Sequence, residues 1–196
     1  AFLAAIEVGK DCTKHKQYGQ LISIEIGVYE PYYVDGVLLT EAFSLGGSWL
    51  DNGINAISVI RKLVFKMEIT TADFVRDNFN KVLLDIKSEV VFVFPKGQGS
   101  VVVDWTQMRD LHKRVLLRFS EGVVALHNTE QSIYESITEG GLKKTHDFSN
   151  TNPRLTNHYI GVYEDLLMKL ASQEDNAKLA RELLAHLLKA RQLGGL

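Results

Sequence analysis

Asp85, Lys87 and Asp104 have the residue types and the spacing of a divalent metal site. Carboxylates on neighbouring strands can hold such an ion, and a lysine beside them can steady the nucleophile that the ion activates. That chemistry requires a third acidic ligand at a defined place, and the sequence offers none. The six histidines also lack the mutual spacing of zinc ligands. We therefore expect neither a metal nor a cofactor.

Nucleophilic and general acid–base catalysis find little support. Cys12 is the only cysteine, and His15, three residues along, is too weak a signal for a thiol–imidazole pair. Arg181 and His186 have the spacing of a family of helical ribonucleases, but the apolar stripe of the same segment already explains a helix there. Gly97 and Gly99 are not followed by the lysine–serine or lysine–threonine pair of a phosphate loop. We expect a protein that is not an enzyme.

Phosphate binding is the chemistry that the charges favour. The chain of 196 residues has a net charge of -2, yet residues 61–118 hold eleven Lys or Arg against seven Asp or Glu, a local excess of +4. Basic and aromatic side chains on a sheet face would neutralise phosphates and stack bases, each stacked base contributing about 1–3 kcal/mol. The candidates are Arg76, Lys81, Lys87, Lys96, Phe79, Phe92, Tyr32 and Tyr33. The competing interpretation makes Phe92 a core residue and Lys81 and Lys87 part of an ordinary solvated strand face.

The first third of the chain has clear local signals. Residues 21–29 alternate between apolar and polar side chains, which predicts a half-buried strand. Asp35-Gly36 is typical of a type I′ turn and predicts a hairpin. Asp51 or Asn52 then caps a predicted helix that runs to about Lys66.

The middle of the chain is harder to assign. Residues 71–88 fit a helix or a hairpin, and we favour the hairpin. Strands are predicted at 90–94, 100–104 and 123–127. We expect a helix after Asp104 that buries Met108, Leu111 and Val115, and another short helix at residues 130–139.

The C-terminal segment predicts an antiparallel helical hairpin over residues 157–196, after a polar linker at 140–156. Its two leucine-rich stripes exceed what one hairpin can bury between its own arms. We therefore expect a homo-oligomer or a partner protein to dock on them. The expected interface residues are Tyr163, Leu166, Leu170, Leu183 and Leu187.

Two stretches within residues 1–139 suggest a duplicated unit. Valine–leucine–leucine, glycine–serine, aspartate and a basic pair follow one another at 37–62 and again at 82–114. Trp49 and Trp105 begin the two candidate helices, and we expect both in the core. The predicted fold class is α+β, with two ββ(ββ)α-type repeats that form antiparallel sheets with packed helices, followed by the helical hairpin.

The second copy carries a family resemblance. Residues 74–89, a Lys-Gly hairpin and residues 101–105 resemble the four-strand-and-helix unit of the transcriptional coactivator positive cofactor four. That unit, doubled in one chain, is the plan of the Whirly and PUR-type single-stranded nucleic-acid-binding proteins. The resemblance covers about residues 20–120 and implies a single-stranded DNA or RNA partner.

Two functions therefore remain open at this point. One is a single-stranded nucleic-acid-binding protein, and the other is a non-catalytic adaptor or assembly subunit whose helical hairpin forms an interface. No apolar run is long enough to cross a membrane. A single cysteine permits no intramolecular disulfide, so we expect an intracellular, reducing compartment.

Overall fold

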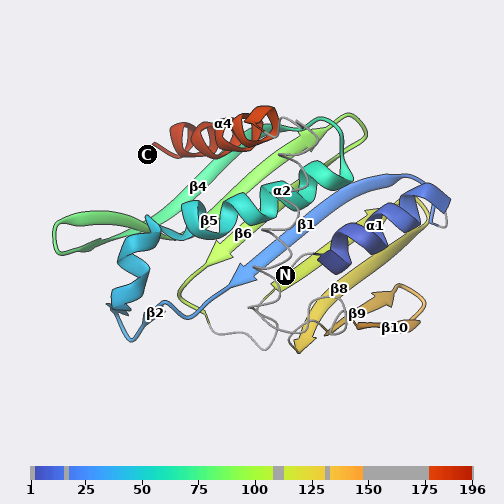
Figure 1. Ribbon diagram of the computed structural model, residues 1–196, viewed down its shortest axis with the longest axis horizontal. Helices are drawn as coiled ribbons and strands as arrows, with labels where there is room; N and C mark the ends of the chain where they lie inside the picture. Colours follow the sequence, from blue (N-terminus) through green and yellow to red (C-terminus); the bar gives the residue numbers. More distant parts are fainter. Residues whose placement is uncertain (1–2, 16–17, 108–112, 131–132, 148–176, 196) are drawn as a thin grey trace, which may run out of the picture.

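The computed structural model describes residues 3–15, 18–107, 113–130, 133–147 and 177–195. An eight-stranded sheet runs through the molecule in the order β10-β9-β8-β7-β1-β6-β5-β4 (Figure 1). The strands are β1 (Leu21–Tyr29), β4 (Glu68–Phe79), β5 (Val82–Phe94), β6 (Gly97–Asp104), β7 (Lys113–Phe119), β8 (Gly122–Glu130), β9 (Ile133–Thr138) and β10 (Lys143–Asp147). Among these described strands, β1 and β6 form the one parallel pair.

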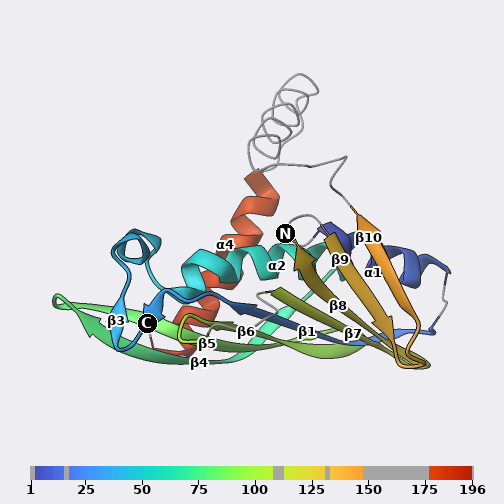
Figure 2. The same ribbon diagram turned by 90° about the horizontal axis from the view of Figure 1, so that it is seen from below.

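The helices that the structure describes all lie on one face of the sheet, and none of them covers the other, which we call the open face (Figure 2). They are α1 (Leu3–His15), α2 (Ile54–Leu63), which continues a π-helical turn η2 (Trp49–Gly53), and α4 (Ala177–Leu193). The alternation of β1 explains the layering, because Ile24, Ile26 and Val28 all point under the helices and are buried. Trp49 and Trp105 are fully buried, which confirms that both belong to the core.

Two predicted hairpins are confirmed. Asp35 and Gly36 have φ of 51° and 80°, as a type I′ turn requires, between β2 (Tyr33–Val34) and β3 (Val37–Leu38). A 3-10 turn, η1 (Thr40–Leu45), follows. The ambiguous segment 71–88 is a hairpin of β4 and β5, whose tip projects beyond the rest of the sheet in Figure 1. Its turn lies at Asn80-Lys81, where φ is 51° and 69°.

The predicted fold class is wrong, because one mixed sheet replaces the two sheet-and-helix repeats. Residues 113–119 of the second predicted helix form β7, where Val115 alternates with Arg114 and points to the helices. Met108 and Leu111 lie outside the described residues. The short helix predicted at 130–139 is contradicted by β9. Apolar side chains three or four positions apart suggested helices, but in both segments the side chains alternate with the period of two that is typical of a strand.

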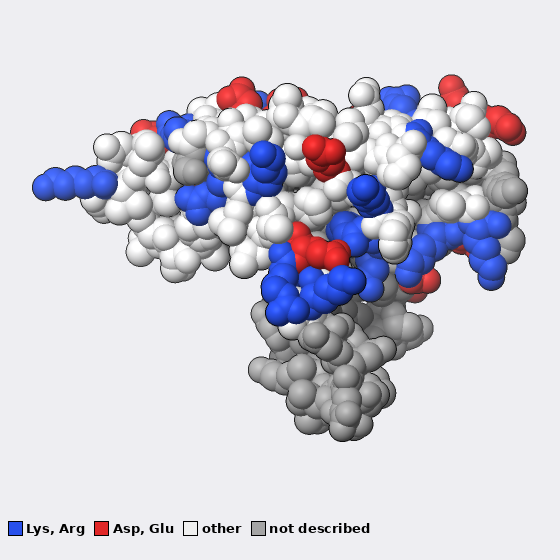
Figure 3. All heavy atoms as spheres, turned by 90° about the horizontal axis from the view of Figure 1, so that it is seen from above, with Lys and Arg blue, Asp and Glu red and all other residues white. Residues whose placement is uncertain are grey.

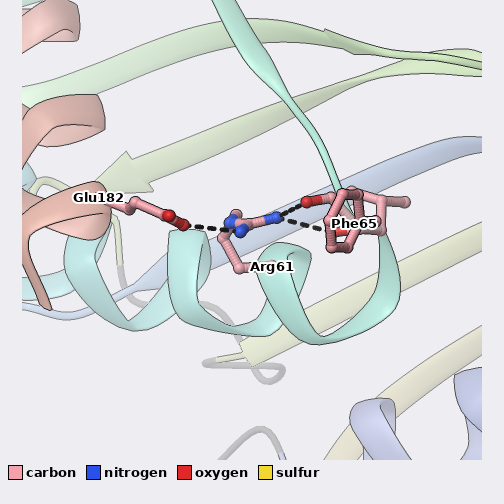
Figure 4. Close-up of polar contacts among 4 residues, drawn as sticks. Arg61, Phe65 and Glu182 are labelled. Carbon is pink, nitrogen blue, oxygen red and sulfur yellow. Dashed lines mark hydrogen bonds and ion pairs between the residues drawn. The ribbon is translucent and has the colours of Figure 1, made fainter. Parts of the chain in front are cut away.

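Near the C-terminus, α4 packs against the body of the chain. Glu182 of α4 forms an ion pair of 2.8 Å with Arg61 of α2, and Arg61 also donates to the carbonyl oxygen of Phe65 (Figure 4). Trp49 Nε1 donates to the carbonyl oxygen of Leu187, at 3.2 Å. Leu187 is buried and Leu183 is half-buried against the core, so this helix covers the sheet.

Other C-terminal predictions fall partly outside the description. The first arm of the predicted helical hairpin, with Tyr163, Leu166 and Leu170, lies outside the described residues. Within the predicted polar linker, Lys143–Asp147 form β10 at the edge of the sheet. None of the described helices combines the length and the apolar character needed to cross a membrane.

Candidate functional site

Polar side chains gather where β1 and β6 end. Because these two strands are parallel, their carboxyl ends meet at one edge, the usual position of binding sites in open sheets that contain parallel strands. Glu30 follows β1, and its backbone N–H donates to the carbonyl oxygen of Asp104 at the end of β6, at 3.1 Å. Lys113 begins β7 on the other side of β1, opposite Val28. Glu30 and Lys113 thus lie side by side beneath η2.

The residues of η2 complete this group. Asn52 is buried, and its Nδ2 donates to Glu30 Oε2 at 3.1 Å and to Asp51 Oδ2 at 2.5 Å. Lys113 Nζ lies 3.6 Å from Glu30 Oε1. Asn55, one turn further along, donates from Nδ2 to the carbonyl oxygen of Asp51 at 3.5 Å. We call Glu30, Asp51, Asn52 and Lys113 the carboxylate cluster.

Asp51 has the electrostatics of an acid–base group. Burial, and after it the negative charge of Glu30, raise the pKa of its carboxyl from 3.8 to about 6, against the opposing effect of the Lys113 ammonium. A carboxyl with a pKa near 6 exchanges protons readily at neutral pH, because both of its forms are populated there. Asp51 can therefore act as a general base or a general acid.

The start of η2 is fixed by Asp85 of β5. The Oδ2 atom of Asp85 accepts hydrogen bonds from Trp49 N at 2.7 Å, from Ser48 Oγ at 2.7 Å and from Ser88 Oγ at 3.0 Å. Gly47, with φ of 107°, allows the close approach, because a Cβ atom there would lie 2.2 Å from Asp85 Oδ1. The predicted cap, Asp51 or Asn52, is thus replaced by a carboxylate from a distant strand.

A buried donor without an acceptor lies near the same edge. Trp105, directly after β6, is fully buried, and its Nε1 has no hydrogen-bond partner among the described residues. The ring of Tyr32 packs edge-on against it, with centroids 5.2 Å apart. Leaving such a group unpaired costs about 1–3 kcal/mol, and functional sites are one place where this cost is tolerated.

The cavities of the described chain lie elsewhere. One of about 520 Å³ lies beside α1 and is lined by Cys12, Ser136 and His146, and burial raises the pKa of the Cys12 thiol. Another of about 550 Å³ lies beyond the other end of β1, beside Phe65 and Phe94. We favour the carboxylate cluster because its charged side chains and the perturbed acid Asp51 converge at the carboxyl ends of the parallel strands β1 and β6.

The residues predicted to bind nucleic acid do not share one face. Phe92 is fully buried, Tyr32 packs on Trp105, and Tyr33 packs on Phe79 while its hydroxyl donates to Asp77 at 2.8 Å. The basic members occupy separate places: Arg76 donates to the carbonyl oxygen of Gly194, Lys81 is at the β4–β5 tip, Lys87 lies 4.0 Å from Asp104 on the open face, and Lys96 is in the β5–β6 turn. Figure 3 likewise shows Lys and Arg in separate groups, with other atoms between them.

The residues with metal-site spacing are also divided. Asp85 points toward η2, whereas Lys87 and Asp104 are paired on the opposite face of the sheet. Among the described residues no group of three or more His, Cys, Asp or Glu could hold a metal ion.

The carboxylate cluster leaves almost no mark in the sequence. The pattern around Asp51 and Asn52 indicates only a helix cap, and Glu30 and Lys113 carry no local signal. Glu30, the adjacent pair Asp51-Asn52, and Lys113 come from three separate parts of the sequence, and they meet because β1 pairs with β7 and η2 crosses above both strands. The one usable signal was Gly46-Gly47 before a short polar turn, which indicates a backbone held close to another group.

Comparison with known proteins identifies the fold. No family model matches the chain, and no curated protein matches it in sequence. An oxidoreductase from Agrobacterium radiobacter, solved with NAD+, L-tartaric acid and magnesium, matches with a TM-score of 0.72 and 13% identity over 97% of this chain and 59% of that one. A dehydrogenase from Clostridium difficile matches with a TM-score of 0.66 and 13% identity over 94% and 57% of the two chains. An inositol dehydrogenase homolog from Azotobacter vinelandii, solved with NADH and myo-inositol, matches with a TM-score of 0.55 and 12% identity over 73% and 39%.

These likenesses show the fold, and this chain spans less than two thirds of each of those proteins. The resemblance to Whirly, PUR-type and positive-cofactor-four proteins is wrong, because the fold is shared with oxidoreductases. The same finding contradicts the predicted nucleic-acid-binding function, the adaptor alternative and the expectation of a protein that is not an enzyme. It also contradicts the predicted partners, a single-stranded nucleic acid and a protein docked on the C-terminal helices.

Proposed function

We propose that this chain forms the substrate-binding part of a nicotinamide-dependent oxidoreductase, in which Asp51 exchanges a proton with a substrate hydroxyl. The observation that carries the proposal is the Asp51 carboxyl, with a pKa of about 6, beside Glu30 and Lys113 at the carboxyl ends of the central parallel strands. The similarity in fold to NAD-binding oxidoreductases supplies the reaction class.

The described residues do not fit the dinucleotide itself. A pyrophosphate binds at a helix N-terminus through free backbone N–H groups, but the Asp85 carboxylate already occupies the N–H of Trp49. Gly97 and Gly99 do not replace that site, because a Cβ atom at either would meet the backbone of β1, at 2.0 and 2.2 Å. We therefore assign to this chain the substrate side of the reaction.

The cluster suits a neutral, hydroxylated substrate. Above pH 6 it holds two carboxylates against one ammonium, and this net negative charge disfavours an anionic ligand. The carboxylates accept hydrogen bonds from substrate hydroxyls, and Lys113 and Asn55 donate to substrate oxygens. Ionised Asp51 takes the proton as the substrate O–H bond breaks, and protonated Asp51 returns it in the reverse direction.

Binding measurements test the proposal on the 196-residue chain. We expect myo-inositol to bind more tightly than L-tartrate at pH 7.5, as followed by calorimetry, and Asp51→Asn to weaken the binding of myo-inositol about tenfold or more, because the substituted amide no longer accepts as a charged group. The matched control is Asp35→Asn in the exposed β2–β3 turn, where asparagine tolerates the positive φ equally well. Equal binding by the wild-type chain and by Asp51→Asn would contradict the assignment.

We also propose a reducing, intracellular compartment. Cys12 is the only cysteine, so the chain cannot form an intramolecular disulfide, and its thiol is free and buried. Quantitative thiol labelling of the unfolded chain from cells should then recover one reactive thiol per chain. A blocked or cross-linked thiol would argue against this compartment.

A further inference from the structure

We infer that Asp85 is a positioning residue for the carboxylate cluster, holding the start of η2 so that Asp51 stays over Glu30 and Lys113. This inference rests on the proposed function, because the group that it positions is the proposed acid–base residue. Asp85 itself lies on β5, which β6 separates from β1, and its carboxylate accepts from Ser48, Trp49 and Ser88.

One buried oxygen of Asp85 is saturated with hydrogen bonds. Asp85 is 3% exposed, and its Oδ2 accepts three hydrogen bonds, two of them from the segment that begins η2. Ser48 and Ser88 are fully buried as well, with their Oγ atoms 2.7 Å apart. A buried carboxylate is tolerated only when donors of this kind surround it, and its negative charge is favourable at the N-terminus of a helix.

A short series of contacts connects Asp85 to Asp51. Asp85 fixes the backbone N–H of Trp49 and packs against Gly47, whose carbonyl oxygen accepts the backbone N–H of Asp51 at 3.1 Å. No side chain on η2 caps the turn in place of Asp85. Loss of the Asp85 carboxylate would therefore release the turn that carries Asp51.

The positioning role of Asp85 differs from a general contribution to stability, because η2 has a second anchor. The side chain of Trp49 anchors η2 independently, through its buried ring and its bond to Leu187 of α4. Removal of Asp85 should thus leave η2 packed on the sheet while its first backbone groups move. A shift of about 1 Å at a catalytic group can lower activity by as much as 100-fold.

The experiment follows the Asp51 carboxyl by carbon-detected NMR titration in the wild-type chain, in Asp85→Ala and in Asp85→Asn. The charged groups that face Asp51 are Glu30, directly after β1, and Lys113 of β7, and all three proteins retain them. We expect the Asp51 midpoint to move by about half a pH unit or more in Asp85→Ala, because its distance from Glu30 changes. The shift should be smaller in Asp85→Asn, which keeps an acceptor oxygen.

Amide hydrogen exchange gives a readout that needs neither ligand nor titration. The N–H of Asp51 should exchange at least about tenfold faster in Asp85→Asn, because its bond to Gly47 opens more often. The matched control is Leu126→Ala, a buried residue on β8, which β7, β1 and β6 separate from the strand that carries Asp85; the substitution should destabilise the chain and leave the Asp85 hydrogen bonds in place. It should leave the Asp51 midpoint and its local exchange relative to neighbouring amides unchanged.

The outcomes separate the inference from the proposed function. An unchanged Asp51 midpoint and unchanged exchange in both Asp85 variants would overturn the positioning role. Equal changes in Leu126→Ala would also overturn it, because lost stability would then explain everything. A wild-type midpoint near the ordinary value of 3.8 would contradict the proposed function instead, whereas faster exchange at Asp51 in Asp85→Asn alone would still support positioning.

Discussion

Replacement of Asp51 by asparagine should stabilise the chain at pH 8 while it weakens ligand binding. The folded-state pKa of this acid lies above its unfolded value, so its contribution to stability is fully present below pH 3.8 and is lost as the pH rises through about 6. Ionised Asp51 therefore opposes folding above pH 6. Asparagine removes that charge and keeps an oxygen that can accept from Asn52 Nδ2.

The size of the effect follows from the pKa difference. A rise from 3.8 to about 6 corresponds to roughly 3 kcal/mol if it is converted in full. Asp51 is partly exposed, and solvent screening reduces this to about 1–2 kcal/mol. For a chain of this size, that is an increase in Tm of about 2–8 °C at pH 8.

Thermal and urea unfolding at pH 8 and pH 4 are the assays. We expect Asp51→Asn to be more stable than the wild-type chain at pH 8, with most of the difference gone at pH 4, where the folded-state carboxyl is protonated. Asp35→Asn in the exposed turn should change little at either pH. An equal gain at both pH values, or a loss at pH 8, would refute the reasoning.

Three further predictions concern packing, backbone geometry and histidine. Leu187→Ala should lower the free energy of unfolding by about 2–5 kcal/mol in urea, because Leu187 lies on the buried side of α4, whereas Leu188→Ala at a half-exposed position of the same helix should change it by less than about 0.5 kcal/mol. Gly47→Ala should destabilise the chain more than Gly36→Ala in the same assay, because both residues have positive φ but only at Gly47 does the new Cβ meet another group, Asp85 Oδ1. Burial lowers the pKa of His146 below its ordinary value of 6.5. The stability that this residue contributes is therefore present above pH 6.5 and is lost as the pH falls below that value. His146→Asn should reduce the loss of Tm between pH 7 and pH 5. A Tm profile unchanged by His146→Asn would contradict this last prediction.

Local signals in the sequence predicted the local structure well. The alternation of residues 21–29 gives β1, Asp35-Gly36 gives a type I′ hairpin, and the leucine stripe near the C-terminus gives α4. Each depends on neighbours within a few residues, which periodicity and turn chemistry describe directly. The burial of Trp49 and Trp105 could also be predicted from the sequence, because large aromatic rings bury a large apolar area.

The sheet and the site could not be predicted because they depend on long-range pairing. The parallel pairing of β1 with β6 joins residues about 75 positions apart, and no local pattern distinguishes it from two separate antiparallel sheets. Segments 113–119 and 133–138 fit helical and strand periods alike until neighbouring strands are known. The raised pKa of Asp51 arises from its burial and from the negative charge of Glu30, against the opposing charge of Lys113, and only the folded chain brings these together.

A pH titration of the Asp51 side-chain carboxyl by NMR in the wild-type chain tests the central claim most directly. The proposed function predicts a midpoint near pH 6 that moves when myo-inositol is added, because a ligand hydroxyl then contacts the carboxyl. A midpoint near 3.8 that does not respond to myo-inositol would contradict the claim that the carboxylate cluster binds substrate and moves its proton.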